Sequence, residues 1–312
     1  MMKKALTFFV LGFIVPSLLA LSLDPKREDH GIPIRKPIPI KEIPLDDATL
    51  RGVILDLADN IWLDIHSRED VLLSIQSIAK EGGVTSERMT KMLESIVREG
   101  LRDMKKEKKG SVEYAAATAK LDDPVLMLSV FPGPDTLALL RECALSQDNR
   151  ATVEALKAYI HVAGAVDAIP LILEIFVGEI VTKSGKDLNP LRNGVYTSLQ
   201  RAAEKLASEN KDDDVKKIYI SLVGMAMIEC EPNAAFQLDQ ILCAGLPDYA
   251  TSIEREKAIE KFLNMGLNTD YFKNVKAEIT KVPASKRRDY SKQPLRVPKE
   301  SEKEIKIMLP SR

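Results

Sequence analysis

Apolar side chains recur every three or four residues along most of the chain between residues 46 and 280. The first such segment begins after Asp46 or Asp47, either of which can cap a helix. Its apolar positions are Leu50, Val53, Ile54, Leu57, Ala58, Ile61, Trp62 and Ile65. This i, i+3, i+4, i+7 spacing is typical of one buried face of an amphipathic helix. Outside a proline-rich segment near the N-terminus, no alternating run exceeds four residues, so the pattern predicts an all-α fold without a sheet.

The same periodicity predicts about a dozen helices of 10–20 residues. Gly82-Gly83 and the sequence FPGP at 131–134 mark two of the stops between them. After the first helix, the expected segments cover residues 68–80, 86–104, 112–121, 124–130, 135–145, 149–163, 167–180, 191–206, 215–226, 233–244, 252–265 and 269–280. Short joints between helices of this length favour antiparallel pairs.

One stretch, NRATVEALKAYIHVAGAVDAIPLILEIF at 149–176, resembles a HEAT repeat. The likeness lies in an arginine that opens the first helix, an Ala-Leu pair in its middle, an aspartate at the joint and an Ala-Ile-Pro lead-in to the second helix: Arg150, Ala155, Leu156, Asp167, Ala168, Ile169 and Pro170. Neighbouring pairs share only the helix–turn–helix rhythm, at spacings near 40 residues. The resemblance implies helix pairs stacked as a HEAT- or armadillo-like α-solenoid, in which each pair buries its apolar face against its neighbours. The alternative is a compact, irregular all-α domain.

The N-terminus reads as an export signal over residues 1–22. Lys3 and Lys4 precede an uncharged stretch rich in Leu and Phe, and Ala20 and Ser22 place small residues at the −3 and −1 positions of a cleavage site. We expect cleavage after Ser22 and a periplasmic or secreted protein. No cysteine follows the site, which argues against a lipid anchor. An uncut segment would instead anchor the chain in the inner membrane.

Two proline-containing arms flank the helical region. Residues 23–45 hold five prolines and are expected to be extended. The region 46–280 carries 28 basic and 38 acidic side chains, whereas residues 281–312 carry 10 and 4. The acidic body argues against nucleic acid as a partner. The tail is expected to stay extended and free, so that Lys286, Arg287, Arg288 and Lys292 offer weak contact to an anionic surface.

No catalytic, cofactor-binding or metal-binding residue emerges from the motifs. The histidines are His30, His66 and His161, and none has a second His or Cys at metal-ligand spacing. Cys143, Cys230 and Cys243 make an odd count, which is not a disulfide framework. The run 212–214 is interpreted as a helix cap and the pair 122–123 as solvated charge at a turn.

These observations favour an exported helical-repeat protein that acts as a binding or scaffold protein in the cell envelope, through protein–protein interaction. Two other classes stay open. One is an all-α enzyme whose cleft is enclosed by a closed helical toroid. The other is a membrane-tethered structural protein that keeps its N-terminal anchor.

Overall fold

The computed structural model describes residues 45–60, 68–146, 148–183, 187–245 and 269–288. Within these ranges the chain forms helices and turns and contains no strand, which confirms the all-α class. The chain divides into two compact units, Met1–Thr136 and Leu137–Arg312, so the predicted helical region 46–280 spans both. The predicted signal and most of the N-terminal arm, the helix at 252–265 and the tail beyond residue 288 lie outside the described residues.

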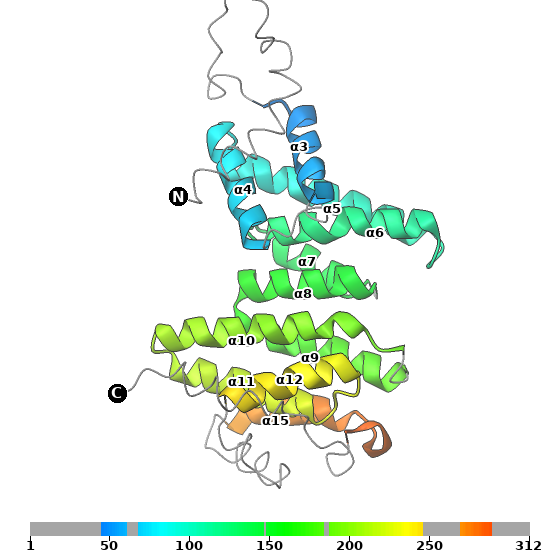
Figure 1. Cartoon of the computed structure of the whole chain (residues 1–312), viewed down its shortest axis with the longest axis vertical. Helices are drawn as coiled ribbons and strands as arrows, with labels where there is room; N and C mark the ends of the chain where they lie inside the picture. The colour runs from blue at the N-terminus through cyan, green and yellow to red at the C-terminus, as the bar shows by residue number, and fades with distance from the viewer. Residues whose placement is uncertain (1–44, 61–67, 147, 184–186, 246–268, 289–312) are drawn as a thin grey trace, which may run out of the picture. The chain divides into compact units, whose positions relative to one another are not determined.

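In its described residues the first unit contains four helices: α3 (Asp47–Asn60), α4 (Arg68–Glu81), α5 (Ser86–Lys106) and α6 (Val112–Leu128). The long helices α5 and α6 pack along each other, and α3 packs against α6 (Figure 1). Asp46 caps α3, because its carboxylate accepts the N–H of Thr49 at 2.7 Å. Thr85 caps α5 in the same way through the N–H of Arg88. Both caps, and the apolar face of α5, follow the sequence pattern.

Helix α6 differs from the prediction of two short helices at 112–121 and 124–130. It runs through Pro124 without a break, and Asp122 and Asp123 are 1% and 2% exposed, not solvated at a turn. A proline inside a helix removes one backbone hydrogen bond. Leu121 and Val125, on either side of this point, are fully buried, so packing of the apolar face continues the helix across the proline.

The second unit contains two layers of helices. After α7 (Thr136–Ala144), which begins at the boundary, α8 (Asn149–Ala163), α10 (Asn193–Ser208) and α12 (Pro232–Gly245) follow one another in one layer (Figure 1). The second layer consists of α9 (Ala165–Thr182), α11 (Asp212–Ala226) and α15 (Thr269–Thr280). Consecutive helices pair across the layers, α8 with α9 and α10 with α11. Each central helix therefore packs on its partner and on both neighbours in its own layer.

The joint between α8 and α9 is a single residue, Gly164, with φ of 95°. Asp148 caps α8 by accepting the N–H groups of Arg150 and Ala151, each at 3.0 Å. Helix α9 already begins at Ala165, earlier than expected, so Asp167 lies in its first turn and Pro170 in its second. From the sequence we expected Pro170 in the first turn of a helix that starts at residue 167, and the earlier start places it one turn further in. Its missing N–H removes a hydrogen bond that the helix would otherwise make.

Among the described helices, none is both long enough and apolar enough to cross a bilayer.

Candidate functional site

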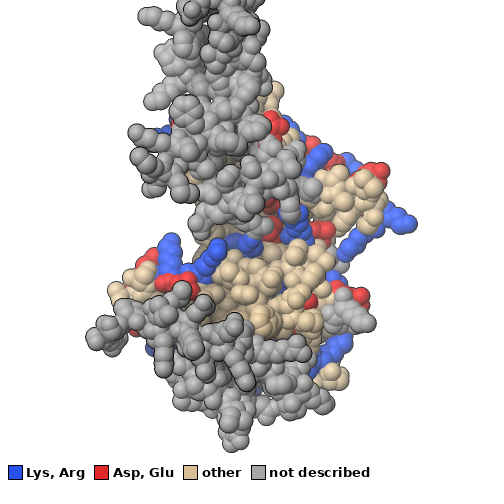
Figure 2. All heavy atoms as spheres, viewed as in Figure 1, with Lys and Arg blue, Asp and Glu red and all other residues tan. Residues whose placement is uncertain are grey.

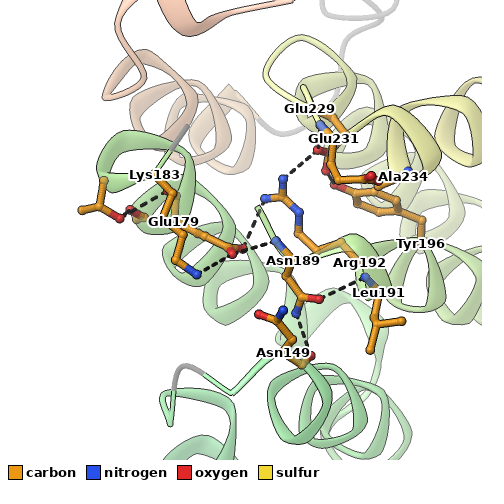
Figure 3. Close-up of polar contacts among 12 residues, drawn as sticks. Asn149, Glu179, Lys183, Asn189, Leu191, Arg192, Tyr196, Glu229, Glu231 and Ala234 are labelled. Carbon is orange, nitrogen blue, oxygen red and sulfur yellow. Dashed lines mark hydrogen bonds and ion pairs between the residues drawn. The ribbon is translucent and has the colours of Figure 1, made fainter. Parts of the chain in front are cut away.

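The most unusual feature of the second unit is a fully buried arginine at the centre of a charged cluster (Figure 3). Arg192 ends the short 3₁₀ turn η3 (Pro190–Arg192), which leads directly into α10. The turn forms because Asn189 caps it, its Oδ1 accepting the N–H of Leu191 at 3.0 Å, and because proline suits the first position. The turn directs Arg192 into the interior and Leu191 toward solvent.

This orientation reverses what the apolar pattern indicates. Leu191 fits the heptad-like spacing of the predicted helix 191–206 and was expected on its buried face. In the structure Leu191 is 42% exposed, and the side chain of Arg192 is 0% exposed. The helix begins only at Asn193, so residue 191 belongs to a turn with a different period.

Arg192 is held by a carboxylate on each side and by an aromatic ring. Its Nη2 lies 2.7 Å from Oε1 of Glu229, whose side chain is also 0% exposed. Its Nη1 lies 3.6 Å from Oε2 of Glu179 on α9. The guanidinium carbon is 5.1 Å from the centre of the Phe176 ring, a cation–π distance. Buried charges of this kind are tolerated only when they are paired.

Tyr196 completes the inner part of the cluster. Its hydroxyl donates to the second carboxylate oxygen of Glu229, and its ring meets Phe176 edge-on at 5.7 Å. Burial, and then the negative charge of Glu229, raise the pKa of Tyr196 well above its ordinary value. The phenol therefore stays protonated at physiological pH and serves as a hydrogen-bond donor.

A second ring of contacts connects the cluster to the surrounding helices. Glu179 accepts from Lys183 Nζ at 2.9 Å and from the N–H of Asn189 at 2.8 Å. The Asn189 amide donates in turn to the carbonyl of Asn149, at the start of α8. Glu229 also accepts the N–H of Glu231 at 2.9 Å, and Glu231 caps α12 through the N–H of Ala234. Figure 3 shows these contacts converging from both layers.

The centre of the cluster is closed to solvent, and its outer part is partly exposed at Lys183. Arg192 and Lys183 oppose Glu179 and Glu229, and the groups at its centre are buried. It joins the beginning of α8, the end of α9, the beginning of α10 and the loop before α12. Its chemistry is that of a structural clamp, since Nη2 of Arg192 and the hydroxyl of Tyr196 both bind Glu229, while Nε and Nη1 of Arg192 make no hydrogen bond within the described residues.

A second polar site lies beside the clamp and involves residues 282–288, which we name the C-terminal strap. Lys286, in the short turn η4 (Ala284–Lys286), donates its ammonium to the carbonyls of Ile180, Val181 and Lys183 at 3.1, 2.7 and 3.2 Å. Arg288 donates two bonds to Asp239 of α12, at 3.0 and 2.5 Å. The side chains of this ion pair are 6% and 2% exposed.

The strap differs from the extended, free tail expected after residue 280. Lys286 and Arg288 direct their charges into the second unit, and Arg287 donates to the carbonyls of Val282 and Thr280. These three side chains are therefore engaged within the molecule and not held ready for an anionic surface. A basic side chain can satisfy helix C-terminal carbonyls or a buried carboxylate, a use that net charge alone does not reveal. Lys292 lies outside the described residues.

The remaining candidates stay apart from one another. His161 is exposed at the end of α8, while His30 and His66 lie outside the described residues. The three cysteines form no disulfide with one another; Cys143 is buried, and Cys230 and Cys243 are partly exposed. The aspartates 212–214 occupy the first turn of α11, where the helix dipole favours their charge as expected, but none of them makes a side-chain cap bond. No group of three metal-ligating side chains occurs within the described residues.

Two local features of the sequence mark the positions of the clamp residues. An Asn-Pro pair at 189–190 marks the turn that buries Arg192, and Glu229 and Glu231 interrupt the apolar run before Pro232. Neither feature shows that these residues meet. Comparison with protein-family models, with curated proteins and with solved structures found no match to this chain.

Proposed function

We propose that this chain is an exported binding or scaffold protein, built from HEAT-like stacked helix pairs, that mediates protein–protein interaction in the cell envelope. The packing of the second unit carries the proposal. Helices α8, α10 and α12 follow one another in one layer, and α9, α11 and α15 pack mutually in the other. This alternation is the arrangement expected of stacked pairs, which use their outer faces to bind extended partners.

The surface of the second unit supports a role in binding. In the view of Figure 2, the area over α8 and α10 holds few charged side chains, although the helical region as a whole is acidic. Leu191 in η3 is 42% exposed and Phe236 in α12 is 45% exposed. The turn η3 packs against α12, so both side chains belong to neighbouring elements. Aromatic and aliphatic anchors within a polar surround are typical of protein interfaces.

The signal-like N-terminus supports the envelope as the location. A basic pair, an uncharged apolar stretch and a small-residue exit at Ala20 and Ser22 are the features that export machinery reads. The buried centre of the clamp supports a scaffold, because its polar groups hold helices in register.

Site-specific photo-crosslinking in the native cell tests this function. A crosslinking side chain would replace Leu191 or Phe236, and Asp213, whose side chain is 85% exposed, would provide the matched control. We expect both apolar positions to crosslink to the same protein in the envelope fraction, while position 213 does not. Retention of the protein in the cytoplasm, or identical crosslinks from all three positions, would contradict the proposal.

A further inference from the structure

The C-terminal strap fills two cation sites that earlier parts of the second unit build. The first is the C-terminal turn of α9, where three backbone carbonyls surround the ammonium of Lys286 at 2.7–3.2 Å. The carbonyls at a helix C-terminus carry partial negative charge and favour a cation. The second is Asp239, which is 1% exposed and receives the guanidinium of Arg288 through two bonds. This forked geometry selects arginine over lysine.

The second unit also contacts the backbone of the strap between these two sites. The carbonyl of Met227, just after α11, accepts the N–H of Arg288 at 3.0 Å. The thiol of Cys230 donates to the carbonyl of Lys286 at 3.1 Å. Arg287, which lies between them, has extended backbone angles and, within the described residues, donates to the carbonyls of Val282 and Thr280, which precede it in the chain. Contacts from alternate residues are typical of recognition of an extended segment.

Polar contacts, and not apolar burial, hold the strap after Val282. Pro283, Ala284 and Ser285 are exposed, and residues 286–288 are partly exposed. A segment with few buried apolar contacts opens locally at a small fraction of the global unfolding free energy. Another segment that presents the same two cations at the same spacing would meet the same acceptors.

We propose that the C-terminal turn of α9, the loop between α11 and α12, and Asp239 form a recognition site for a peptide segment of the pattern Lys-x-Arg, which the strap occupies in cis as a built-in competitor. This inference rests on the proposed function, because it assigns a partner chemistry to a binding protein. Tethering keeps the strap at a high effective concentration near the site. An external Lys-x-Arg segment therefore binds well only when the strap is weakened or the segment is in excess.

Fluorescence polarisation on the full-length protein tests the competition. The probe is a labelled peptide with the sequence of residues 281–288, KVPASKRR. We compare the wild type with a Lys286→Ala/Arg288→Ala double variant, in which the strap loses both cations, and with Arg287→Ala as the matched control. We expect the double variant to bind the peptide about tenfold more tightly than the wild type or Arg287→Ala, because the tethered competitor is weakened. A folded double variant that binds no more tightly than the wild type overturns the proposal.

Hydrogen–deuterium exchange on the wild type keeps the proposal testable if the double variant does not fold. Excess KVPASKRR should displace the strap and accelerate exchange of the Arg288 amide, which is bonded to Met227. The control peptide KVPASARA, which lacks both cations, should leave this amide unchanged. An Arg288 amide that exchanges equally with both peptides overturns the site. The crosslinks from positions 191 and 236 do not involve the strap, so their persistence after such a failure would leave the binding function standing.

Discussion

At the scale of single residues, the second unit depends on charges that are removed from water. Arg192 and Glu229 are both fully buried, and Tyr196 fixes the carboxylate from its other side. A pair of this kind adds little net stability compared with apolar residues of the same volume, but losing one partner is costly because the other charge stays buried. The clamp therefore serves mainly to specify one arrangement of the helix ends.

We predict that Arg192→Ala lowers the free energy of unfolding by about 3–5 kcal/mol, because it leaves Glu229 buried without its guanidinium. Urea unfolding followed by circular dichroism measures the loss. The matched control is Lys273→Ala, which breaks the exposed pair with Asp270, at 72% and 81% side-chain exposure. This control should change stability by less than about 0.5 kcal/mol. Equal losses in the two variants would show that Arg192 is not clamped.

Tyr271 on α15 makes stability depend on pH in the alkaline range. Burial raises the pKa of Tyr271 to about 12, while its hydroxyl lies 2.9 Å from that of Ser221. Between pH 10 and 12 the unfolded chain releases this proton and the folded chain retains it, so stability falls as pH rises.

We therefore predict that the stability advantage of the wild type over Tyr271→Phe shrinks by about 1.4 kcal/mol between pH 9 and pH 11. Urea unfolding of both proteins at the two pH values measures the difference. The comparison with Phe removes the contributions of all other titrating groups, which the two proteins share. An advantage that stays constant or grows over this range would mean that Tyr271 is exposed to solvent.

The residues of the clamp show the limit of sequence reasoning at this scale. The caps Asp46, Thr85 and Asp148 were predictable because a cap depends only on its own helix start. Arg192 and Glu229 are 37 residues apart, and their pairing depends on how α9, α10 and α12 meet. From a single sequence a charged residue is predicted to be exposed, because the residue that pairs with it in the fold is not known.

At the scale of elements, helix–helix packing decides which small residues are required. At Gly224 on α11, an added Cβ would lie 2.4 Å from Cδ1 of Ile279 and 3.2 Å from Cγ1 of Val275, both on α15. At Gly178 on α9, an added Cβ would meet nothing within 4 Å. Both glycines lie inside an apolar helix, and the sequence alone does not distinguish them. Of the two, only Gly224 is a point of close approach between two helices.

Replacing glycine by alanine should therefore change the stability of the protein in opposite directions at these two positions. We predict that Gly178→Ala stabilises the protein by about 0.4–1 kcal/mol, because alanine reduces the entropy of the unfolded chain and suits a helix. Gly224→Ala should destabilise it by about 1–3 kcal/mol, because Ile279 and Val275 are buried and must shift. Thermal unfolding of both variants tests the pair. Stabilisation by Gly224→Ala would show that α11 and α15 do not pack closely.

Phe176 on α9 offers a second test of the layer packing. It is 1% exposed, whereas Phe236 on α12 is 45% exposed. We predict that Phe176→Ala costs about 3–5 kcal/mol through lost burial and the cavity left behind. Phe236→Ala, as the matched control, should cost about 0.5 kcal/mol or less. A loss below 1 kcal/mol at position 176, measured by urea unfolding, would contradict this packing.

Most elements were predictable from the apolar period, and the errors have local causes. The last described helix, Thr269–Thr280, agrees with the prediction at both ends, and α5 buries the expected face. The break that we expected in α6 is absent, because burial of the residues on either side of Pro124 outweighs the lost backbone hydrogen bond. Helix α9 starts earlier than we expected, because Gly164 alone forms the joint and no side chain caps the helix. Propensity is a weak guide where tertiary packing opposes it.

At the scale of the whole molecule, the chain combines an acidic helical body with basic segments that serve different ends. Between residues 46 and 280, acidic side chains exceed basic ones by ten, whereas basic side chains prevail beyond residue 280. Two of the basic side chains beyond residue 280, Lys286 and Arg288, bind acceptors within the second unit. Net charge by segment is thus a poor guide to the charge that a partner meets.

We predict that the mature protein begins at Leu23. The basic pair at positions 3 and 4, the apolar stretch and the small residues Ala20 and Ser22 place the cleavage after residue 22. Intact mass and N-terminal sequencing of the protein from its native host measure the start. Ser22→Pro provides the control, since a proline at the −1 position should block processing and leave the longer chain. A native protein that retains Met1 would favour the membrane-tethered alternative.

The position of the strap bears on how the protein is made. Asp239 and Arg288 are separated by 49 residues, so α12 leaves the ribosome well before the arginine that joins it. The contact between Arg288 and Asp239 can therefore form only after synthesis has passed residue 288. Chains interrupted earlier would carry α9 and α12 without that contact, and proteases that sample local opening would remove them first. A chain that ends before residue 288 lacks the contacts that the strap makes with α9 and α12.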